Sequence, residues 1–368
     1  MPQPGLGVAV RLEGLSKRFV HGAKGEVAAV SSVSLEVPAG SLMTLLGPSG
    51  CGKTTCLRMV AGFETPDAGR VWIGGRDVTG LPANHRQIGF VFQNYALFPH
   101  LTVFENVAYG LRVKKVPARE IAERVRQVLA LVGLAGYERQ FPNQLSGGEQ
   151  QRVALARVIV VQPTVLLFDE PLSNLDAKLR VQMRAEIQRL QRALAITTIY
   201  VTHDQEEAMA ISDWIAVMNR GELLQVGPPH ELYYAPRSLF VAQFIGRANL
   251  VPAVVTAVVP DGVTLALLGD ACRAPSPGTP IASGSRVRAL VRPEAVGLAR
   301  GGGAPGIPGK VAEAVFLGEK SEYGIEVGGG QRLTVTTSDP ALADLRPGDA
   351  VTLTLRGELV RLFPEAGA

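Results

Sequence analysis

The sequence contains only three cysteines, Cys51, Cys56 and Cys272, and their spacing matches no metal-ligand pattern. This scarcity argues against a cysteine-ligated metal site, and a disulfide between Cys51 and Cys56 would distort the fold around them. We therefore expect a reducing compartment, the cytosol. Cys51 precedes Lys53 and a predicted helix start, which favours a reactive thiol. An inert small residue in a turn is an equally good interpretation.

Long apolar runs are also missing. No stretch of about 18 apolar residues occurs, so we expect no segment that crosses a bilayer. Residues 248–268, the most apolar candidate, are interrupted by Pro252, Pro260 and Asp261. Residues 1–7 lack the basic flank and apolar core of a signal peptide. The net charge is only +4 and no Lys/Arg block occurs, so the sequence gives no indication of nucleic-acid binding.

The composition that remains, 46% hydrophobic and 19% charged, is typical of a folded soluble protein. In the first two thirds, short apolar runs alternate with longer amphipathic ones, which predicts an α/β domain with a mostly parallel sheet. The clearest helix runs from about Ala177 to Ala195, where apolar residues recur every three or four positions. The predicted strands are Leu42–Leu46, Ile88–Phe92, Val165–Phe168, Thr198–Val201 and Trp214–Met218.

The pattern changes near residue 240. Residues 241–368 are rich in Val, Gly and Pro with short alternating runs, which predicts a small all-β domain. We therefore expect two domains, residues 8–240 and residues 241–368. Within the second, residues 284–294 resemble residues 348–358, which favours two related β units; chance similarity between strands rich in Val and Leu is the alternative.

A complete G-x-x-x-x-G-K-[ST] motif lies between an apolar strand-like run and a helix-like run, the context that makes this motif a phosphate cradle. Its glycines let backbone N–H groups turn inward around an anion, and a helix N-terminus adds about half a positive charge. Lys53 would reach the β- and γ-phosphates of a nucleotide, and the Thr54 hydroxyl would ligate Mg²⁺. A glycine-rich turn with a chance lysine fits this context poorly. The residues assigned to cofactor binding here are Gly47, Pro48, Ser49, Gly50, Cys51, Gly52, Lys53, Thr54 and Thr55.

Two carboxylates follow the predicted strand Val165–Phe168. A buried strand of a parallel sheet delivers such residues to the sheet edge where ligands bind. Asp169 would hold Mg²⁺, and Glu170 would orient and deprotonate an attacking water. A surface turn is the alternative for an isolated Asp-Glu pair, but the phosphate-loop motif favours the catalytic interpretation.

The segment Leu145–Arg152 predicts a helix start with a capping box between Ser146 and Glu149. Gly147 and Gly148 occupy the first two helical positions, where each glycine costs about 1 kcal/mol relative to alanine. They leave the helix N-terminus uncovered, so we expect a phosphate group to bind there.

This set of motifs, in this order through residues 8–240, resembles the ATP-binding cassette (ABC) family, whose signature Leu145–Gln150 matches. The resemblance implies a P-loop NTPase fold with a helical subdomain, and a homodimer that binds two ATP molecules. Each ATP would lie between the phosphate loop of one copy and the signature helix of the other. The residues assigned to the partner's nucleotide are Ser146, Gly147, Gly148 and Gln150.

Four more residues take roles from the same resemblance. Gln93 would contact Mg²⁺ and the attacking water, and His203 would bond the γ-phosphate. Asp176 would link the two sites across the dimer. Phe19 occupies the adenine-stacking position, and an interior aromatic of the first strand is the alternative. The apolar segment 95–101 would receive a coupling helix from a transmembrane permease subunit; a satellite of the core is the alternative.

Residues 241–368 resemble the C-terminal, OB-like TOBE extension of bacterial importer ATPases for sugars, polyamines, ferric iron, sulfate and phosphonates. This implies an ATP-hydrolysing subunit at the cytoplasmic face of the cell membrane. Its partners would be permease subunits and, indirectly, a periplasmic or lipid-anchored solute-binding protein. The stretch 244–249 resembles polyamine, ferric iron or phosphonate importers, with a sugar as the alternative cargo.

Three other classes of protein fit less well. Cassette ATPases of DNA repair carry long coiled-coil insertions, and ribosomal ones carry two cassettes; this chain has neither. A switch GTPase would need the Asn-Lys-x-Asp tetrad, which is absent. A catalytically inactive regulatory subunit would lack a catalytic residue, and none is missing.

Overall fold

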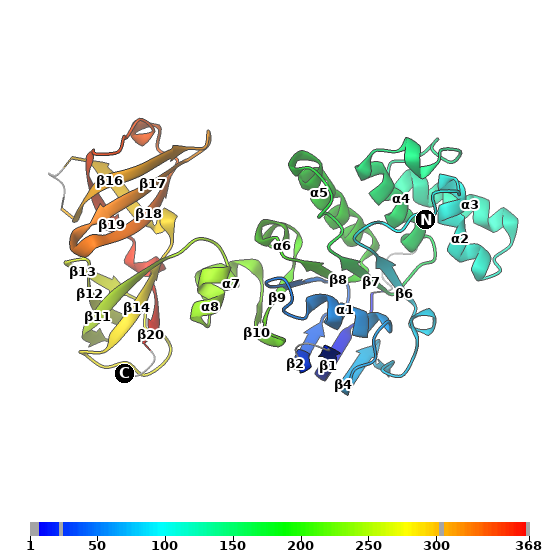
Figure 1. The fold of residues 1–368 in the computed structure, drawn as a ribbon, viewed down its shortest axis with the longest axis horizontal. Coiled ribbons are helices and arrows are strands. Elements are labelled where there is room, and N and C mark those ends of the chain that lie inside the picture. Colours follow the sequence, from blue (N-terminus) through cyan, green and yellow to red (C-terminus); the bar gives the residue numbers. More distant parts are fainter. Residues whose placement is uncertain (1–6, 22–24, 302–304, 366–368) are drawn as a thin grey trace. The chain divides into compact units, whose positions relative to one another are not determined.

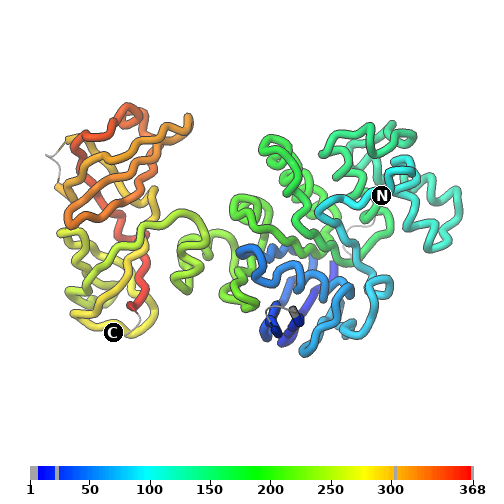
Figure 2. The backbone as a smooth tube through the Cα atoms, in the orientation of Figure 1, coloured from blue at the N-terminus to red at the C-terminus, as the bar shows by residue number. Residues whose placement is uncertain are grey.

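The computed structural model describes residues 7–21, 25–301 and 305–365 of the chain (Figures 1 and 2). Most of the stretch read for signal-peptide features, residues 1–6, lies outside this range. The chain forms two compact units, residues 1–229 and 230–368, so the composition change near residue 240 falls within the second unit. In the described residues, no helix combines the length and apolar character that a bilayer crossing requires.

A buried, mostly parallel sheet forms the centre of the first unit. Its strand order is β10-β9-β3-β8-β7-β6, and only β10 runs antiparallel to its neighbour. Parallel strands that are covered on both faces read as continuous apolar runs, as the first four residues of β7 do. The strands are β3 (Leu42–Leu46), β6 (Ile88–Val91), β7 (Val165–Asp169), β8 (Thr197–Thr202), β9 (Trp214–Asn219) and β10 (Glu222–Gly227).

Helix α1 (Lys53–Ala61) covers one face of this sheet and packs with a second, antiparallel sheet of order β2-β1-β4-β5 (Figure 1). Met43 and Leu45 of the central strand belong to the same core cluster as Leu57 of α1 and Leu12 of the antiparallel sheet. The additional elements are β1 (Val10–His21), β2 (Gly25–Val37), β4 (Ala68–Ile73), β5 (Arg76–Asp77) and the 3₁₀ turn η1 (Ala83–His85).

Helices cover the opposite face of the parallel sheet. Leu42 and Phe168 share a core cluster with Val107 of α2 and Leu155 of α4, so the first unit has three layers. Ser146 and Thr102 each form a capping box at the start of their helices, as the sequence predicts for Ser146. The elements are α2 (Val103–Val113), α3 (Ala118–Leu131), η2 (Pro142–Gln144), α4 (Gly147–Ile159), α5 (Ala177–Leu194) and α6 (Gln205–Ile211).

The second unit begins with two short helices, α7 (Pro229–Tyr234) and α8 (Leu239–Phe244), and continues as strands alone apart from 3₁₀ turns. Two five-stranded antiparallel sheets, β13-β12-β11-β14-β20 and β15-β19-β16-β17-β18, share one core cluster. The strands are β11 (Asn249–Val259), β12 (Gly262–Leu267), β13 (Asp270–Ala274), β14 (Arg286–Val291), β15 (Val296–Arg300), β16 (Ile307–Phe316), β17 (Ser321–Val327), β18 (Gln331–Thr337), β19 (Ala350–Leu355) and β20 (Arg361–Pro364). The turns are η3 (Pro293–Ala295), η4 (Gly328–Gly330), η5 (Pro340–Leu342) and η6 (Gly357–Leu359).

The two similar stretches of sequence occupy equivalent places in these sheets. Each begins with a strand, β14 or β19, and continues into a 3₁₀ turn, η3 or η6. After each turn the chain crosses to the other sheet. Strand β15, which follows β14, pairs with β19, and strand β20, which follows β19, pairs with β14. This reciprocal exchange supports two related β units rather than chance similarity.

Candidate functional site

The glycine motif forms a loop between β3 and α1 that only glycine can build at two points. A Cβ atom on Gly52 would lie 2.2 Å from the Ala29 carbonyl oxygen, and one on Gly47 would lie 2.2 Å from that of Met218. Gly52 also has a φ of 103°, a left-handed conformation that L side chains disfavour. Helix α1 starts directly afterwards with no side-chain cap, so its first N–H groups remain available to an anion.

Lys53 is buried inside this loop, with 4% of its surface exposed. Its ammonium group donates hydrogen bonds to the carbonyl oxygens of Gly47 at 2.7 Å and Pro48 at 3.0 Å. These bonds hold a positive charge beside the open helix N-terminus. The loop therefore combines a buried cation with free backbone donors, which suits a polyphosphate.

Cys51, in the same loop, is 3% exposed, and burial raises the pKa of its thiol. The nearby Lys53 charge acts in the opposite direction but is the smaller influence on this pKa. The thiol is therefore protonated at neutral pH, and the structure favours an inert residue over a reactive one.

Thr54 and Asp169 meet at the carboxyl edge of the parallel sheet. The Thr54 hydroxyl donates a hydrogen bond to Asp169 Oδ1 over 3.0 Å, although 115 positions separate the two residues in sequence. Burial raises the pKa of Asp169, because a charged carboxylate loses solvation there. A hydroxyl and a poorly solvated carboxylate are oxygen donors of the kind that Mg²⁺ prefers, so the pair fits that ion.

Glu170 and His203 form a second pair beside the first. His203 Nδ1 lies 3.1 Å from Glu170 Oε2, and the two residues follow the adjacent strands β7 and β8. Glu170 has a φ of 46°, a conformation that costs about 1 kcal/mol or more for a residue other than glycine. Its backbone N–H donates to the Val201 carbonyl oxygen at 3.0 Å, which holds this turn against β8.

Gln93 follows β6 and contacts the segment after Glu170. Its side-chain amide donates to Ser173 Oγ at 3.2 Å, and the Asn174 amide donates to the Gln93 carbonyl oxygen at 3.2 Å. The residue predicted to link two sites, Asp176, caps helix α5 by accepting a hydrogen bond from the Leu179 N–H at 2.9 Å. In the described residues, no hydrogen bond joins Gln93 to Thr54 or Asp169.

The signature segment starts helix α4 as predicted and also packs against α5. Ser146 and Glu149 form the predicted capping box. A Cβ atom on Gly148 would lie 2.8 Å from Leu179 Cδ1, and one on Gly147 would lie 3.2 Å from Leu175 Cδ2. Packing against these leucine side chains gives a second reason for small residues at both positions, and anion binding there stays a prediction. The Gln150 amide donates to the carbonyl oxygens of Pro142 and Leu145, so it fixes the approach to the helix.

The signature segment and the phosphate loop do not meet within one chain. Over the ranges that the structure describes, no hydrogen bond or ion pair connects residues 146–150 with residues 47–55. The sheet edge thus brings together the phosphate loop, Asp169, Glu170 and His203, and leaves Ser146 apart.

Comparisons with known proteins agree with this geometry. Residues 30–173 match the family described as ABC transporter, and residues 289–363 match the TOBE domain. The chain is 48% identical over 355 residues to the spermidine/putrescine import ATP-binding protein PotA of Rubrobacter xylanophilus, covering 95% of this chain and 92% of that protein. It is 47% identical over 339 residues to the Fe(3+) ions import ATP-binding protein FbpC of Brucella abortus, covering 92% and 93%.

The chain belongs to the ATP-binding subunits of ABC importers. It therefore binds and hydrolyses ATP. Its first unit resembles the dimeric ATP-binding cassette MJ0796 in a post-hydrolysis state bound to ADP and Pi, with 31% identity and a TM-score of 0.54. That likeness covers 60% of this chain and 98% of the cassette, which confirms the predicted P-loop fold.

Phe19 of this importer ATPase lies outside the core. It is 36% exposed on β1, and the Lys17 ammonium lies 5.5 Å from its ring centroid. The structure therefore disfavours the interior-aromatic alternative and leaves the ring available for stacking.

The apolar segment 95–101 is anchored to helices of the same subunit. Tyr95 is 7% exposed, and its carbonyl oxygen accepts a hydrogen bond from Arg157 at 2.8 Å. Asn106 of α2 donates to the carbonyl oxygens of Phe98 and Leu101. One part of the segment therefore belongs to the core, while Phe98 and Leu97 are only partly buried.

Sequence reasoning missed two residues of the importer ATPase that hold the His203 turn. The Glu207 carboxylate is buried and accepts hydrogen bonds from the Tyr200 and Thr202 hydroxyls, and burial raises its pKa. Arg180 of α5 pairs with Asp204, the residue after His203, at 3.4 Å. The sequence assigned no role to either residue, although Arg180 ends the family stretch that begins at Glu170, because these roles depend on contacts between two helices and a strand end.

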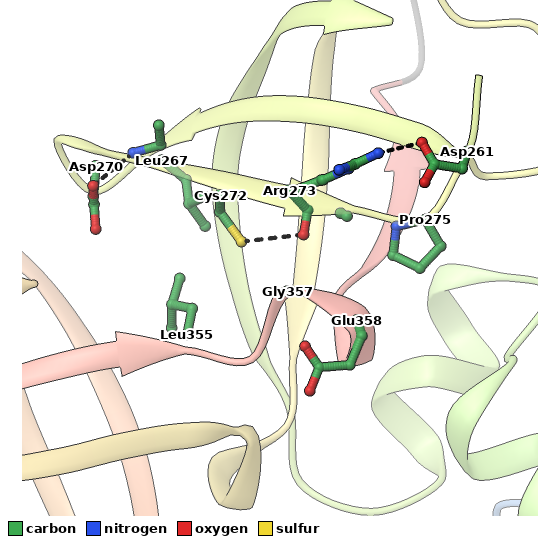
Figure 3. A pocket seen from close by; sticks show the side chains of 11 residues that line it. Asp261, Leu267, Asp270, Cys272, Arg273, Pro275, Leu355, Gly357 and Glu358 are labelled. Atoms are coloured by element: carbon green, nitrogen blue, oxygen red, sulfur yellow. Dashed lines mark hydrogen bonds and ion pairs between the residues drawn. The ribbon is translucent and has the colours of Figure 1, made fainter. Parts of the chain in front are cut away.

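A cavity in the second unit is larger than the one beside Glu170, so cavity volume alone does not identify the candidate ATPase site. It has a volume of about 460 Å³ and lies between the β12–β13 hairpin and residues 355–358 (Figure 3). Asp261 is paired with Arg273, and Asp270 accepts a hydrogen bond from the Ala271 N–H at 2.8 Å. The cavity lined by Glu170 and His203, the residues predicted to act in hydrolysis, measures only about 60 Å³.

Proposed function

We propose that two copies of this importer ATPase bind ATP head to tail and that ATP hydrolysis drives solute uptake through permease subunits. The observation that carries the proposal is the separation within one chain: Thr54 contacts Asp169 and Glu170 contacts His203 at the same sheet edge, whereas Ser146 makes no contact with them. A second copy would supply Ser146, Gly147 and Gly148 to the nucleotide. The likeness to the dimeric cassette MJ0796 supports this arrangement.

The nucleotide site has a role for each group. Lys53 and the N–H groups that open α1 would bind the β- and γ-phosphates, and Phe19 would stack on the adenine. Thr54, Asp169 and Gln93 would hold Mg²⁺, which when bound neutralises phosphate charge. The hydrogen bond between Thr54 and Asp169 supports the first two of these ligands.

Glu170 would accept the proton of the attacking water, and His203 would bond the γ-phosphate. Both side chains lie at the mouth of the cavity of about 60 Å³, where a water and a phosphate oxygen could meet them. Catalysis would depend mainly on positioning and on electrostatic stabilisation rather than on a covalent intermediate. Asp176, at the start of α5, would face the partner copy.

Membership of an importer family supports the proposal of transport partners. Permease subunits would bind around Gln93 and the partly exposed side chains of segment 95–101. A solute-binding protein would deliver the cargo on the far side of the membrane, and this subunit would act peripherally at the cytoplasmic face. The TOBE domain would have a regulatory role.

We propose a polyamine as the cargo, with ferric iron as the second candidate. The polyamine-import relative matches over 95% of this chain and the iron-import relative over 92%, at nearly equal identity. Among these relatives, none is named for phosphonate or sugar import, so those cargoes have weaker support. Cargo contacts other subunits, so residues of this chain do not select between the two.

Uptake in the source organism tests the proposal. Cells that lack this subunit should lose uptake of labelled spermidine, and the wild-type chain should restore it, whereas Lys53→Ala should not. Loss of labelled ferric iron uptake instead would favour the second candidate. If neither uptake changed while sugar or phosphonate uptake fell, both candidate cargoes would be wrong.

A further inference from the structure

The turn that carries His203 is held by its neighbours rather than by the histidine itself. His203 is exposed and has one hydrogen-bond partner among the described residues, Glu170. On one side, the Thr202 hydroxyl donates to Glu207 and accepts from the Asp204 N–H at 3.0 Å. On the other side, Asp204 Oδ1 accepts the Glu207 N–H at 3.1 Å and caps α6. The position of the imidazole therefore depends on the orientation of Asp204 as well as on the contact with Glu170.

Arg180 connects this turn to a different segment. Its Nη1 lies 3.4 Å from Asp204 Oδ2, and its Nη2 donates to the Leu175 carbonyl oxygen at 3.1 Å. Leu175 immediately precedes Asp176, the cap of α5. A planar guanidinium can make two such bonds in fixed directions, which a lysine ammonium cannot reproduce. One side chain thus links the residue before Asp176 with the residue after His203.

The same segment is tied at its other end to Gln93. Ser173 accepts a hydrogen bond from the Gln93 amide, and Asn174 donates to the Gln93 carbonyl oxygen. Residues 173–176 therefore lie between Gln93 and the Arg180–Asp204 pair. A displacement of this segment could reach His203 by two routes. One runs from the Ser173 hydroxyl to the Glu170 carbonyl oxygen at 3.0 Å and from the Glu170 carboxylate to His203. The other runs through Arg180 to Asp204 and acts on the turn that carries the histidine.

The Arg180–Asp204 pair acts through geometry more than through binding energy. The two side chains are 32% and 28% exposed, so solvent screens part of their attraction. Asp204 would still cap α6 through Oδ1 if Arg180 were absent, so the fold would persist. Asp204 Oδ2 would lose its partner, and the turn that carries His203 would then be free to rotate.

We propose that Arg180 is a positioning residue that couples residues 173–176 to His203, so that the placement of Asp176 sets the placement of the imidazole. The inference rests on the proposed function, in which Asp176 faces a partner copy and His203 bonds the γ-phosphate. His203 would thereby be aligned only when a partner copy contacts Asp176. Arg180 makes no contact with the nucleotide in this scheme.

The test compares Arg180→Met with Arg189→Met in the full chain. Arg189 lies on the same helix and also binds one carboxylate, Glu186, and one carbonyl oxygen, Leu131, but it is remote from His203. We expect Arg180→Met to lower kcat about tenfold, as misplacement of a catalytic group does, with KM for ATP changed less than about twofold. Arg189→Met should leave both constants near wild type. Equal losses in the two variants, or a raised KM with kcat unchanged, would refute the coupling.

A second background separates this inference from the proposed function. In a His203→Ala chain, adding Arg180→Met should cause no further loss in single-turnover hydrolysis, because the residue through which Arg180 acts is gone. The same fold-loss in both backgrounds would overturn the inference alone. If His203→Ala by itself left kcat at the wild-type value, the role of His203 would be wrong and the inference would fall with it.

Discussion

His203 Nδ1 lies 3.1 Å from Glu170 Oε2. The contact joins the ends of two adjacent parallel strands, so the two residues assigned to ATP cleavage meet within a single chain. The signature residue Ser146 has no such contact with the phosphate loop. Under the proposed function, one chain of this importer ATPase would therefore contain the hydrolytic pair but not the whole nucleotide site.

Replacing Glu170 with Gln should leave ATP binding intact and lower turnover by at least about 100-fold, because the amide cannot accept a proton from water. Release of labelled phosphate measures turnover, and filter retention of labelled ATP measures binding. Glu206→Gln is the matched control, since Glu206 is exposed on the first turn of α6. Turnover near wild type in Glu170→Gln would exclude the proton-acceptor role.

Lys53→Ala should weaken ATP binding by about tenfold or more, because it removes a charge-assisted hydrogen bond to phosphate. Titration calorimetry measures the dissociation constant directly. Lys178→Ala removes an exposed lysine from α5 and should leave the constant unchanged. Equal affinities in Lys53→Ala and the wild type would contradict the phosphate-cradle assignment.

Two glycines of the loop should respond differently to alanine. At Gly52 the new Cβ would lie 2.2 Å from the Ala29 carbonyl oxygen, so the backbone must move. At Gly50 nothing lies within 4 Å, and only the φ of 78° is unfavourable. We expect Gly50→Ala to cost about 1 kcal/mol of unfolding free energy and Gly52→Ala about 3 kcal/mol or more. Denaturant unfolding measures both values, and a larger cost at Gly50 would show that the loop is built differently.

Asp169 makes the stability of the metal-free protein depend on pH. Burial raises the pKa of Asp169 in the folded state, so its contribution to stability is complete below the unfolded pKa and is lost as pH rises through the folded pKa. Asp169→Asn removes the titratable carboxyl group, so the variant does not lose this stability as the pH rises. The thermal midpoint of the variant should therefore exceed that of the wild type by a margin that grows between pH 4 and about pH 7, while Mg²⁺-dependent ATPase activity disappears. A margin that shrank with rising pH would contradict the direction of the shift.

Arg292 should be important for the stability of the second unit. It is 2% exposed, donates to the carbonyl oxygens of Ala242, Arg247 and Tyr233, and stacks 4.2 Å from the Tyr233 ring centroid. We expect Arg292→Met to cost about 2–4 kcal/mol, since three carbonyl acceptors, one of them in a buried bond, lose their donor. Arg288→Met, which breaks only an exposed contact with Glu365, should cost less than about 1 kcal/mol. Calorimetric melting distinguishes the two, and similar costs would show that Arg292 has no special role.

The parallel sheet and its motifs could be predicted from the sequence with good accuracy. The strand Leu42–Leu46 was predicted at its exact ends, and helix α5 differs from the prediction only at Ala195. Buried parallel strands and amphipathic helices have strong periodic signals. Each motif follows a predicted strand of the parallel sheet. The sequence therefore predicts that Thr54 and Asp169 lie close together at the same edge of that sheet.

Contacts between distant segments could not be predicted. The sequence predicts an anion near Gly148, but it did not show that a Cβ atom there would lie 2.8 Å from Leu179 of another helix. The pair Arg180 and Asp204 depends on how α5 packs beside α6, and no local pattern encodes that packing. The burial that keeps the Cys51 thiol protonated likewise depends on tertiary structure.

The most direct test of the ATP-bound homodimer is the molar mass of the Glu170→Gln chain in solution, measured by light scattering during gel filtration with ATP and Mg²⁺. The chain has a mass of 39.0 kDa. We predict twice this mass with ATP and Mg²⁺, and the monomer mass when Ser146→Arg is added to block the signature helix. A Glu170→Gln chain that binds ATP fully yet stays at 39.0 kDa would contradict the account.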